Sequence, residues 1–397
     1  MMMMLGLALV LLPVGLAVYA YALYPALLSL IAARKRPPRF GDPAVWPMVT
    51  ITVPVYNEEA IIRSTLEGLL ALDYPRDRLH IVVISDASTD RTDDIVREFS
   101  SVGVELLRMP QRKGKSAAEN AAGAAIRGEI VVNTDATIRI PRDSLKALIR
   151  VFQDPSVGVA SGRDVSVGHA AAEGNGAESG YVGYEMWVRS LETRVDSIVG
   201  ASGCFYAIRA AIYDSQFPQE LSRDFASAIM AKEHGLRAVS VHQAICLVPR
   251  TTSLESEYRR KVRTMARGLE TLWFKRHMMS VRRYGLFAVM LMSHKLCRWL
   301  VPLLLPLVLV GLVLASKQGV VARAGLGLAV ALGAAGVIGW RWPRGAGHKV
   351  PAALAIPGYL VAAVTAAFAA WAKALRREHN ALWEPTRRPA LPAQKIV

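Results

Sequence analysis

The chain has 397 residues, of which 52% are hydrophobic, and it carries a formal net charge of +16. Both values are high for a soluble enzyme. No nucleic-acid-binding motif accompanies the charge, and much of it flanks apolar segments, so we expect a lipid bilayer with anionic headgroups as the partner and no nucleic acid. The three cysteines have neither metal-ligand spacing nor a disulfide framework, which is consistent with a reducing cytosolic environment.

The first apolar segment covers residues 1–33, contains no charged side chain, and is followed by the basic cluster Arg34–Arg39. It is long enough to span a bilayer. A secretory signal peptide, the alternative, needs a positive start and a shorter apolar core, and neither is present. We therefore expect an N-terminal transmembrane helix over 1–33 with the basic cluster on the cytoplasmic side.

Strands and helices alternate from Val49 to about Val167. Apolar runs predict strands at 49–55, 80–85, 104–107 and 130–133, and the segments between them predict helices near 58–70, 91–100 and 115–127. This alternation is typical of a parallel sheet with helices on both faces. The block from 40 to 250 is long enough to form one domain with its own core.

Three of these predicted strands run into acidic residues, which are Glu58, Asp86 and Asp135. Because ligands bind outside the carboxyl ends of the strands in open α/β sheets, the three acids are expected at one edge. They predict a site for a cation and a phosphate-bearing ligand, which points to an enzyme.

An amphipathic helix is predicted after residue 252, within a segment of interfacial helices from 251 to 298. Its apolar residues recur every three or four positions, at Leu254, Tyr258, Val262, Met265, Leu269 and Leu272. Arg260, Arg263 and Arg267 lie on another face. Either these arginines bind anionic lipid, or Arg260 or Arg263 binds the phosphates of a ligand.

Three further apolar stretches, at 299–315, 320–340 and 351–371, predict C-terminal transmembrane helices over 299–372. With the N-terminal helix they make four spans, which would place the tail at 373–397 outside, although its basic residues favour the cytoplasm. Either one segment is re-entrant or interfacial, or residues 286–292 belong to a further insertion.

Seven short motifs, spread over about residues 45–300, carry a resemblance to a known family. They are Val53–Glu58, Ser85–Asp90, Arg112–Lys115, Asn133–Thr137, Gly200–Gly203, Ser222–Asp224 and Arg259–Arg263. In order and spacing the chain resembles a family 2 glycosyltransferase, in the membrane-integrated branch that includes cellulose, chitin and hyaluronan synthases. The resemblance implies an α/β, Rossmann-like GT-A domain in the cytoplasm with flanking transmembrane helices, in a multi-pass protein of the cell membrane.

The resemblance also assigns a donor site. The implied donor-binding residues are Pro54, Tyr56, Glu58, Asp86, Lys115, Asp135, Arg260 and Arg263. Asp135 matches the first acid of the family's metal-binding Asp-x-Asp and would hold Mg²⁺ or Mn²⁺, whereas Thr137 replaces the second acid. One carboxylate can still serve, because Mg²⁺ often keeps waters and substrate phosphates as ligands, but the affinity should be lower. Arg112 and Lys113 are expected at the surface.

On the acceptor side, Asp224 matches the catalytic base, and Ser202 and Gly203 are the implied acceptor-binding residues. Asp224 would begin a helix whose apolar side is Phe225, Ile229 and Leu236, and its neighbour Arg223 would keep it ionised. Structural alternatives remain open for each motif: Asn57 as a helix N-cap, Lys115 in a solvated loop, Asp135 as a plain strand end, Asp224 as a surface cap, and Gly200–Gly203 as a simple turn.

The expected function is the inverting transfer of a sugar from a nucleotide-sugar donor, UDP-linked, to a lipid-linked or polysaccharide acceptor. Where the family has Gln-x-x-Arg-Trp, the chain has Arg260 to Thr264, without the Gln and the Trp. The missing Trp argues against a processive synthase that secretes its polymer. That synthase, and a non-catalytic subunit that binds a nucleotide sugar, are the alternatives.

Overall fold

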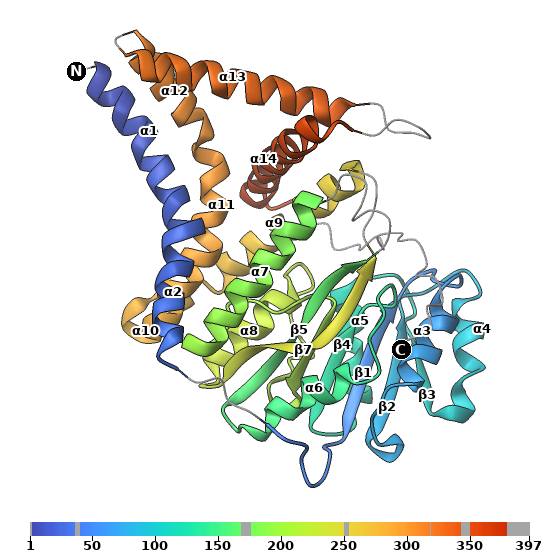
Figure 1. Ribbon diagram of the computed structural model, residues 1–397. Helices are drawn as coiled ribbons and strands as arrows, with labels where there is room; N and C mark the ends of the chain where they lie inside the picture. The colour runs from blue at the N-terminus through green and yellow to red at the C-terminus, as the bar shows by residue number, and fades with distance from the viewer. Residues whose placement is uncertain are drawn as a thin grey trace.

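The computed structural model describes residues 2–35, 40–167, 176–249, 254–317, 319–342 and 350–378. Residues 36–39 of the basic cluster, the side chain of Leu254 and the tail from residue 379 lie outside this description. A body of sheet and helices forms one part of the molecule, and long apolar helices extend from one side of it (Figure 1).

A seven-stranded sheet forms the centre of the body, in the order β3-β2-β1-β4-β6-β5-β7. The first four strands are parallel, as predicted, and are β1 (Val49–Val55), β2 (Leu79–Ser85), β3 (Val104–Arg108) and β4 (Ile130–Thr134). β5 (Val157–Val167) pairs in parallel with β7 (Arg237–Pro249). Only β6 (Phe205–Arg209), which follows the predicted block, runs antiparallel to its neighbours, so the described sheet is mixed.

Helices cover both faces of this sheet, which explains why every residue of β1 is buried. One face packs against α3 (Ile62–Leu70), α4 (Thr92–Arg97) and α6 (Ser144–Arg150). The other packs against α5 (Lys115–Ala121) and α8 (Arg223–Glu233).

Two local expectations about helices are wrong. Asn57 has a left-handed backbone (φ 53°) and α3 begins only at Ile62, so Asn57 is not its N-cap. Instead its side chain bonds to Thr89 in the loop after β2. Leu236 does not lie on α8, because the helix ends at Glu233 and Gly235 turns the chain with φ +74°; glycine adopts this conformation readily.

A second layer of helices packs outside α8. It contains α2 (Tyr24–Ala33), α7 (Gly176–Val195), α9 (Leu254–Phe274) and α10 (Val281–Leu291). Phe225 and Ile229 of α8 contribute to the core of this layer, as does Leu28 of α2. The second half of the N-terminal apolar segment is thus part of the body, next to the sheet domain.

Within the described ranges, four helices are long and apolar enough to cross a membrane, and they cover 2–33, 281–316, 320–341 and 353–376. The first contains α1 (Met2–Val18) and the last two are α13 (Val320–Arg341) and α14 (Ala352–Arg376). The second is longer than the predicted 299–315. It joins α10 to α12 (Leu305–Ser316), so residues 286–292 continue into this segment and do not form a separate insertion.

Candidate active site

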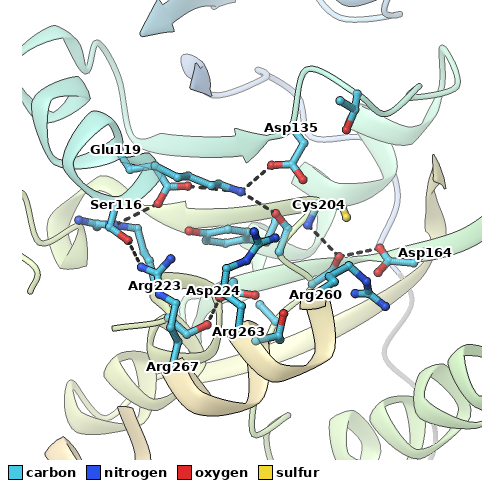
Figure 2. A pocket seen from close by; sticks show the side chains of 18 of the residues that line it. Ser116, Glu119, Asp135, Asp164, Cys204, Arg223, Asp224, Arg260, Arg263 and Arg267 are labelled. Carbon is cyan, nitrogen blue, oxygen red and sulfur yellow. Dashed lines mark hydrogen bonds and ion pairs between the residues drawn. The ribbon is translucent and has the colours of Figure 1, made fainter. Parts of the chain in front are cut away.

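A cavity of about 320 Å³ opens at the carboxyl edge of the sheet. Its walls come from the end of β4, from α5, from the loop before β6, from α8 and from α9, so segments more than 100 residues apart meet there (Figure 2). The predicted site residues that line it are Lys115, Asp135, Ser202, Gly203, Asp224, Arg260 and Arg263.

Lys115 and Asp135 form an ion pair inside the cavity. The Nζ of Lys115 lies 2.5 Å from Oδ1 of Asp135 and 3.2 Å from the carbonyl oxygen of Gly203. Burial opposes the ammonium charge, but Asp135 and Glu119 outweigh it and raise the pKa of Lys115 above its usual value. Lys115 is therefore not part of a solvated loop, and Asp135 faces the cavity.

Asp224 occupies the first turn of α8 and faces the loop before β6. Ser222, the N-cap residue, donates its hydroxyl to Oδ1 of Asp224 over 2.5 Å. A Cβ atom at Gly203 would lie 2.7 Å from Oδ2 of Asp224, so only glycine fits there without displacing the carboxylate. The Gly200–Gly203 turn thus brings backbone close to the predicted base.

The expected pairing of Arg223 with Asp224 is wrong. Arg223 bonds to Asn120 and to the carbonyl oxygen of Asp214, and its Nε lies 3.6 Å from Glu119. Successive residues of a helix point about 100° apart, so neighbours in sequence do not face each other. Arg223 and Lys115 instead flank Glu119, whose pKa is raised by burial in spite of these two cations.

Three arginines of α9 reach the cavity from the side opposite Asp135 (Figure 2). Arg260 pairs with the buried Glu257, with its Nη2 2.5 Å from Oε1. Arg267 donates to the carbonyl oxygens of Gln219 and Leu221 and to Ser116. With Arg263 they bring positive charge to the wall where the resemblance puts a diphosphate.

Ser202 lies in a polar cluster in the wall of the cavity. Its hydroxyl donates to Oδ1 of Asp164 over 2.6 Å, and its amide donates to Ser161. The thiol of Cys246 also donates to Oδ1 of Asp164. Burial first and Asp164 second raise the pKa of Cys246 well above the usual value, which keeps this thiol protonated.

The remaining predicted donor residues lie outside the lining of this cavity. Pro54 is buried within β1, and both oxygens of Asp86 accept backbone amides, from Lys113 and Gly114. The guanidinium of Arg112 stacks over the ring of Tyr56 at 3.9 Å, so Arg112 is half-buried and not a surface residue as expected.

Glu58 is half-buried in the loop after β1, where its backbone amide donates to Thr92. This loop and the loop after β2 are tied to one another by such contacts between Asn57–Glu59 and Thr89–Thr92.

A divalent cation fits the oxygen donors at Asp135. Oδ1 faces Lys115, and no hydrogen bond to Oδ2 occurs among the described residues. No group of three or more His, Cys, Asp or Glu side chains able to hold a metal occurs in the part of the chain that the structure describes. Asp135 would therefore need the phosphates of a ligand to complete the coordination of Mg²⁺ or Mn²⁺.

Several cavity residues were not predicted. Glu119 follows Lys115 by four positions and Arg267 follows Arg263 by four, so helical periodicity could have identified both. Asp164 on β5 and Arg189 on α7 also line the cavity. They belong to no motif. The pairing of β5 in the sheet places Asp164, and the packing of α7 on the sheet places Arg189.

Part of the chain is similar to known glycosyltransferases. Residues 50–212 match the family model described as Glycosyl transferase family 2. The chain is 42% identical over 95 residues to the probable glycosyltransferase YdaM of Bacillus subtilis, over 23% of each chain. It is 31% identical over 172 residues to beta-monoglucosyldiacylglycerol synthase of Synechocystis, over 42% of this chain and 36% of that protein. The matches thus span less than half of these relatives.

A similar fold has been solved for the mannosyltransferase PcManGT from Pyrobaculum calidifontis, in complex with GDP-Man and Mn²⁺. The TM-score is 0.72 at 24% identity, over 96% of this chain and all of that one. The described fold is accordingly the GT-A fold. Residues 50–212 match the family 2 glycosyltransferase model, and in this chain they are followed by C-terminal apolar helices.

Proposed function

We propose that the protein is a membrane-integrated inverting glycosyltransferase, with its catalytic domain on the cytoplasmic side. It would move a sugar from a nucleotide-sugar donor, UDP-linked, to a lipid-linked or polysaccharide acceptor beside the bilayer. The observation that carries this proposal is the cavity in which Asp224 faces the Lys115–Asp135 pair and the arginines of α9.

In this mechanism Asp224 is the general base. The acceptor hydroxyl loses its proton to Asp224 while its oxygen attacks the anomeric carbon, and the nucleoside diphosphate leaves. Ser222 and Gly203 fix the position of the carboxylate. Lys115, Arg263 and Arg267 supply positive charge around the leaving diphosphate. A Mg²⁺ or Mn²⁺ ion at Asp135 would add to this charge stabilisation when bound.

The stacked Arg112 and Tyr56 support a nucleotide site beside this cavity, because both side chains present flat surfaces suited to a base. Asp86 supports it indirectly by holding the backbone before Lys115. We retain residues 40–250 as the catalytic domain and move the start of the C-terminal membrane segment from residue 299 to residue 281.

A processive synthase of the cellulose, chitin or hyaluronan type is the second candidate. Thr264 lines the cavity at the place where the family motif has Trp, so no aromatic side chain is available there to stack on an acceptor sugar. Single transfer is therefore the better supported function.

The test is transfer by the detergent-purified chain, with Mn²⁺, radiolabelled nucleotide sugars and membrane lipid extract. The panel includes UDP-sugars and, because the similar structure holds GDP-Man, GDP-mannose. We expect label from one donor in a lipid or glycan fraction, and a loss of about 10²–10⁴-fold in Asp224→Asn, the contribution of a general base. Asp77→Asn, at an exposed side chain, is the control.

Donor binding without transfer in the presence of native lipid would favour the non-catalytic subunit. A ladder of long products would favour the processive synthase.

A further inference from the structure

Arg189 of α7 is a buried cation of the cavity that the transfer mechanism does not use. It lines the cavity, is only 9% exposed, and none of the described residues accepts a hydrogen bond from its Nε or Nη1. Its ionic partner is Glu185, at 3.4 Å. A buried guanidinium with unused donors is costly in free energy. A ligand that accepts from it would remove that cost.

The carboxylate of Glu185 does not neutralise Arg189 alone. Lys295 lies 3.4 Å from the same oxygen, Oε1, and Arg298 lies 3.1 Å from Oε2. Three basic side chains therefore share one carboxylate. Glu192, the other carboxylate here, is bonded to His294 and to the hydroxyl of Tyr24. The cluster thus holds excess positive charge next to the cavity, and an anion would balance it.

This charge is separate from the charge assigned to the donor. The donor cations come from α5 and α9, whereas Arg189 comes from α7, and Lys295 comes from the apolar segment that follows α10. Lys295 approaches the wall formed by the Gly200–Gly203 turn, since a Cβ at Gly200 would lie 3.7 Å from its Nζ. The excess charge therefore lies on the side of the acceptor-binding turn.

A second cavity, of about 360 Å³, lies between β5 and α7 and shares Asp164 with the first. Its α7 wall contains Val182, Met186 and Trp187. Tyr184 of the same helix donates to the carbonyl oxygen of Tyr21, in the N-terminal apolar helix. An apolar chain could therefore extend from the catalytic cavity along α7 toward the membrane helices.

We propose that the acceptor is a membrane lipid whose headgroup carries a phosphate ester beside a free hydroxyl. Arg189, supported by Lys295, binds the phosphate, and the cavity between β5 and α7 holds the hydrocarbon. This inference rests on the proposed transferase function. In the reaction the hydroxyl oxygen bonds to the anomeric carbon, the bond from that carbon to the diphosphate oxygen breaks with its electron pair, and Asp224 takes the proton.

Binding without turnover tests this inference independently of catalysis. The full chain in detergent is titrated with dioctanoyl phosphatidylglycerol, with dioctanoylglycerol, which lacks the phosphate, and with sn-glycerol 3-phosphate, which lacks the hydrocarbon. We expect phosphatidylglycerol to bind at least tenfold more tightly than either. Arg189→Gln should weaken its binding about tenfold and leave dioctanoylglycerol unchanged, and Arg189→Lys should restore part of the loss.

Two controls separate a specific site from general attraction to a basic protein. Arg282→Gln removes the same charge from an exposed position on α10 and should leave all affinities within twofold. Nucleoside diphosphate binding should also survive in Arg189→Gln.

Equal affinity for the two lipids, or an unchanged affinity in Arg189→Gln, would overturn the inference. So would tighter binding of sn-glycerol 3-phosphate, which would indicate a soluble phosphate ester. If no nucleotide sugar is turned over but these differences appear, the phosphate site stands and the transferase proposal fails.

Discussion

The Gly203 backbone passes so close to Asp224 that a single methyl group at Gly203 would displace the carboxylate. The added Cβ would lie 2.7 Å from Oδ2, inside van der Waals contact. The carboxylate cannot move away freely, because its Oδ1 accepts a hydrogen bond from the hydroxyl of Ser222. The position of the predicted base therefore depends on the absence of a side chain across from it.

Gly203→Ala should lower the turnover number with little loss of stability. A misplacement of about 1 Å at a reacting group costs on the order of 10²-fold in rate. The matched control is Gly68→Ala on α3, where an added Cβ meets nothing within 4 Å and turnover should not change. Transfer rates and thermal unfolding of both variants decide the point; equal rates would show that Gly203 does not position Asp224.

His80 should make the stability of the protein dependent on pH on the acid side. It is buried on β2, and burial lowers its pKa below the usual 6.5 in spite of Glu105. As pH falls below about 6.5, the unfolded chain takes up the proton first, so stability is lost until the pH passes the lowered pKa of the folded state. Above about pH 7.5 both states are nearly unprotonated, and His80 contributes almost no slope.

In His80→Gln this part of the pH dependence should disappear. Thermal unfolding of the two proteins is compared at pH 8, 6.5 and 5. The difference in midpoint between them should change mainly between the two lower values, and a constant difference would contradict the interpretation.

Helices α13 and α14 pack through glycine. A Cβ at Gly339 would lie 2.2 Å from the carbonyl oxygen of Leu354, and one at Gly336 would lie 2.3 Å from Val361. Small residues at a contact let the backbones of two apolar helices approach each other closely. The approach of the two helices is therefore fixed at these two positions.

Gly339→Ala should separate α13 from α14 and destabilise the protein by about 1–3 kcal/mol, the usual cost of overpacking. Gly333→Ala, on the same helix with nothing within 4 Å, should be neutral or slightly stabilising. Thermal unfolding in detergent measures both changes. Equal midpoints would mean that the helices adjust without cost.

The strands of the sheet domain could be predicted from sequence because each one is an apolar run of consecutive residues. The apolar runs of β1, β2 and β4 are buried on both faces, and each has the predicted boundaries within one residue. The antiparallel direction of β6 could not be predicted from any run of residues, since it depends on how α7 returns the chain to the sheet. The longer second apolar segment was missed because His294, Lys295 and Arg298 interrupt its hydropathy. In the structure His294 and Arg298 are buried and Lys295 is half-buried, and all three pair with Glu185 of α7.

In the site, too, residues that belong to sequence motifs were predicted and residues placed by packing were not. Motif residues such as Asp135, Asp224 and Arg263 were found and do meet in one cavity. Arg223 was assigned the wrong partner because adjacency in sequence was taken for adjacency in space. Arg189 gave no signal because its burial depends on the packing of α2, α7 and α10.

At the scale of the whole molecule, α14 lies along α9 and not apart from the body. Lys261 of α9 contacts the ring of Tyr359 at 5.0 Å, and Trp371 donates to the carbonyl oxygen of Trp299 over 3.0 Å. In the most apolar 18-residue stretch of α14, 28% of the residues are buried in the protein, against 6–11% in the other three apolar helices. We infer that α14 lies at the membrane interface and that only the first three segments cross the bilayer.

An interfacial α14 would place its C-terminal end on the same side as the catalytic domain, which agrees with its basic residues. Glu378→Cys should react with a membrane-impermeant maleimide in inverted membrane vesicles and not in right-side-out vesicles. Asp77→Cys in the catalytic domain should behave likewise, and Met4→Cys should show the opposite pattern. Labelling of Glu378→Cys together with Met4→Cys would instead mean four spans.

The ion pair between Lys115 and Asp135 has a consequence for the order in which ligands arrive. In the free protein the group expected to meet the diphosphate and the group expected to hold the cation neutralise each other at 2.5 Å. A donor or a cation that binds alone must break this ion pair and leaves one of the two charges without a partner. When both bind, the diphosphate pairs with Lys115 and the cation pairs with Asp135. Donor and cation should therefore bind with positive cooperativity, and each should raise the affinity of the other by the same factor. An enzyme built in this way would be nearly indifferent to free metal in the cell until a nucleotide sugar is present.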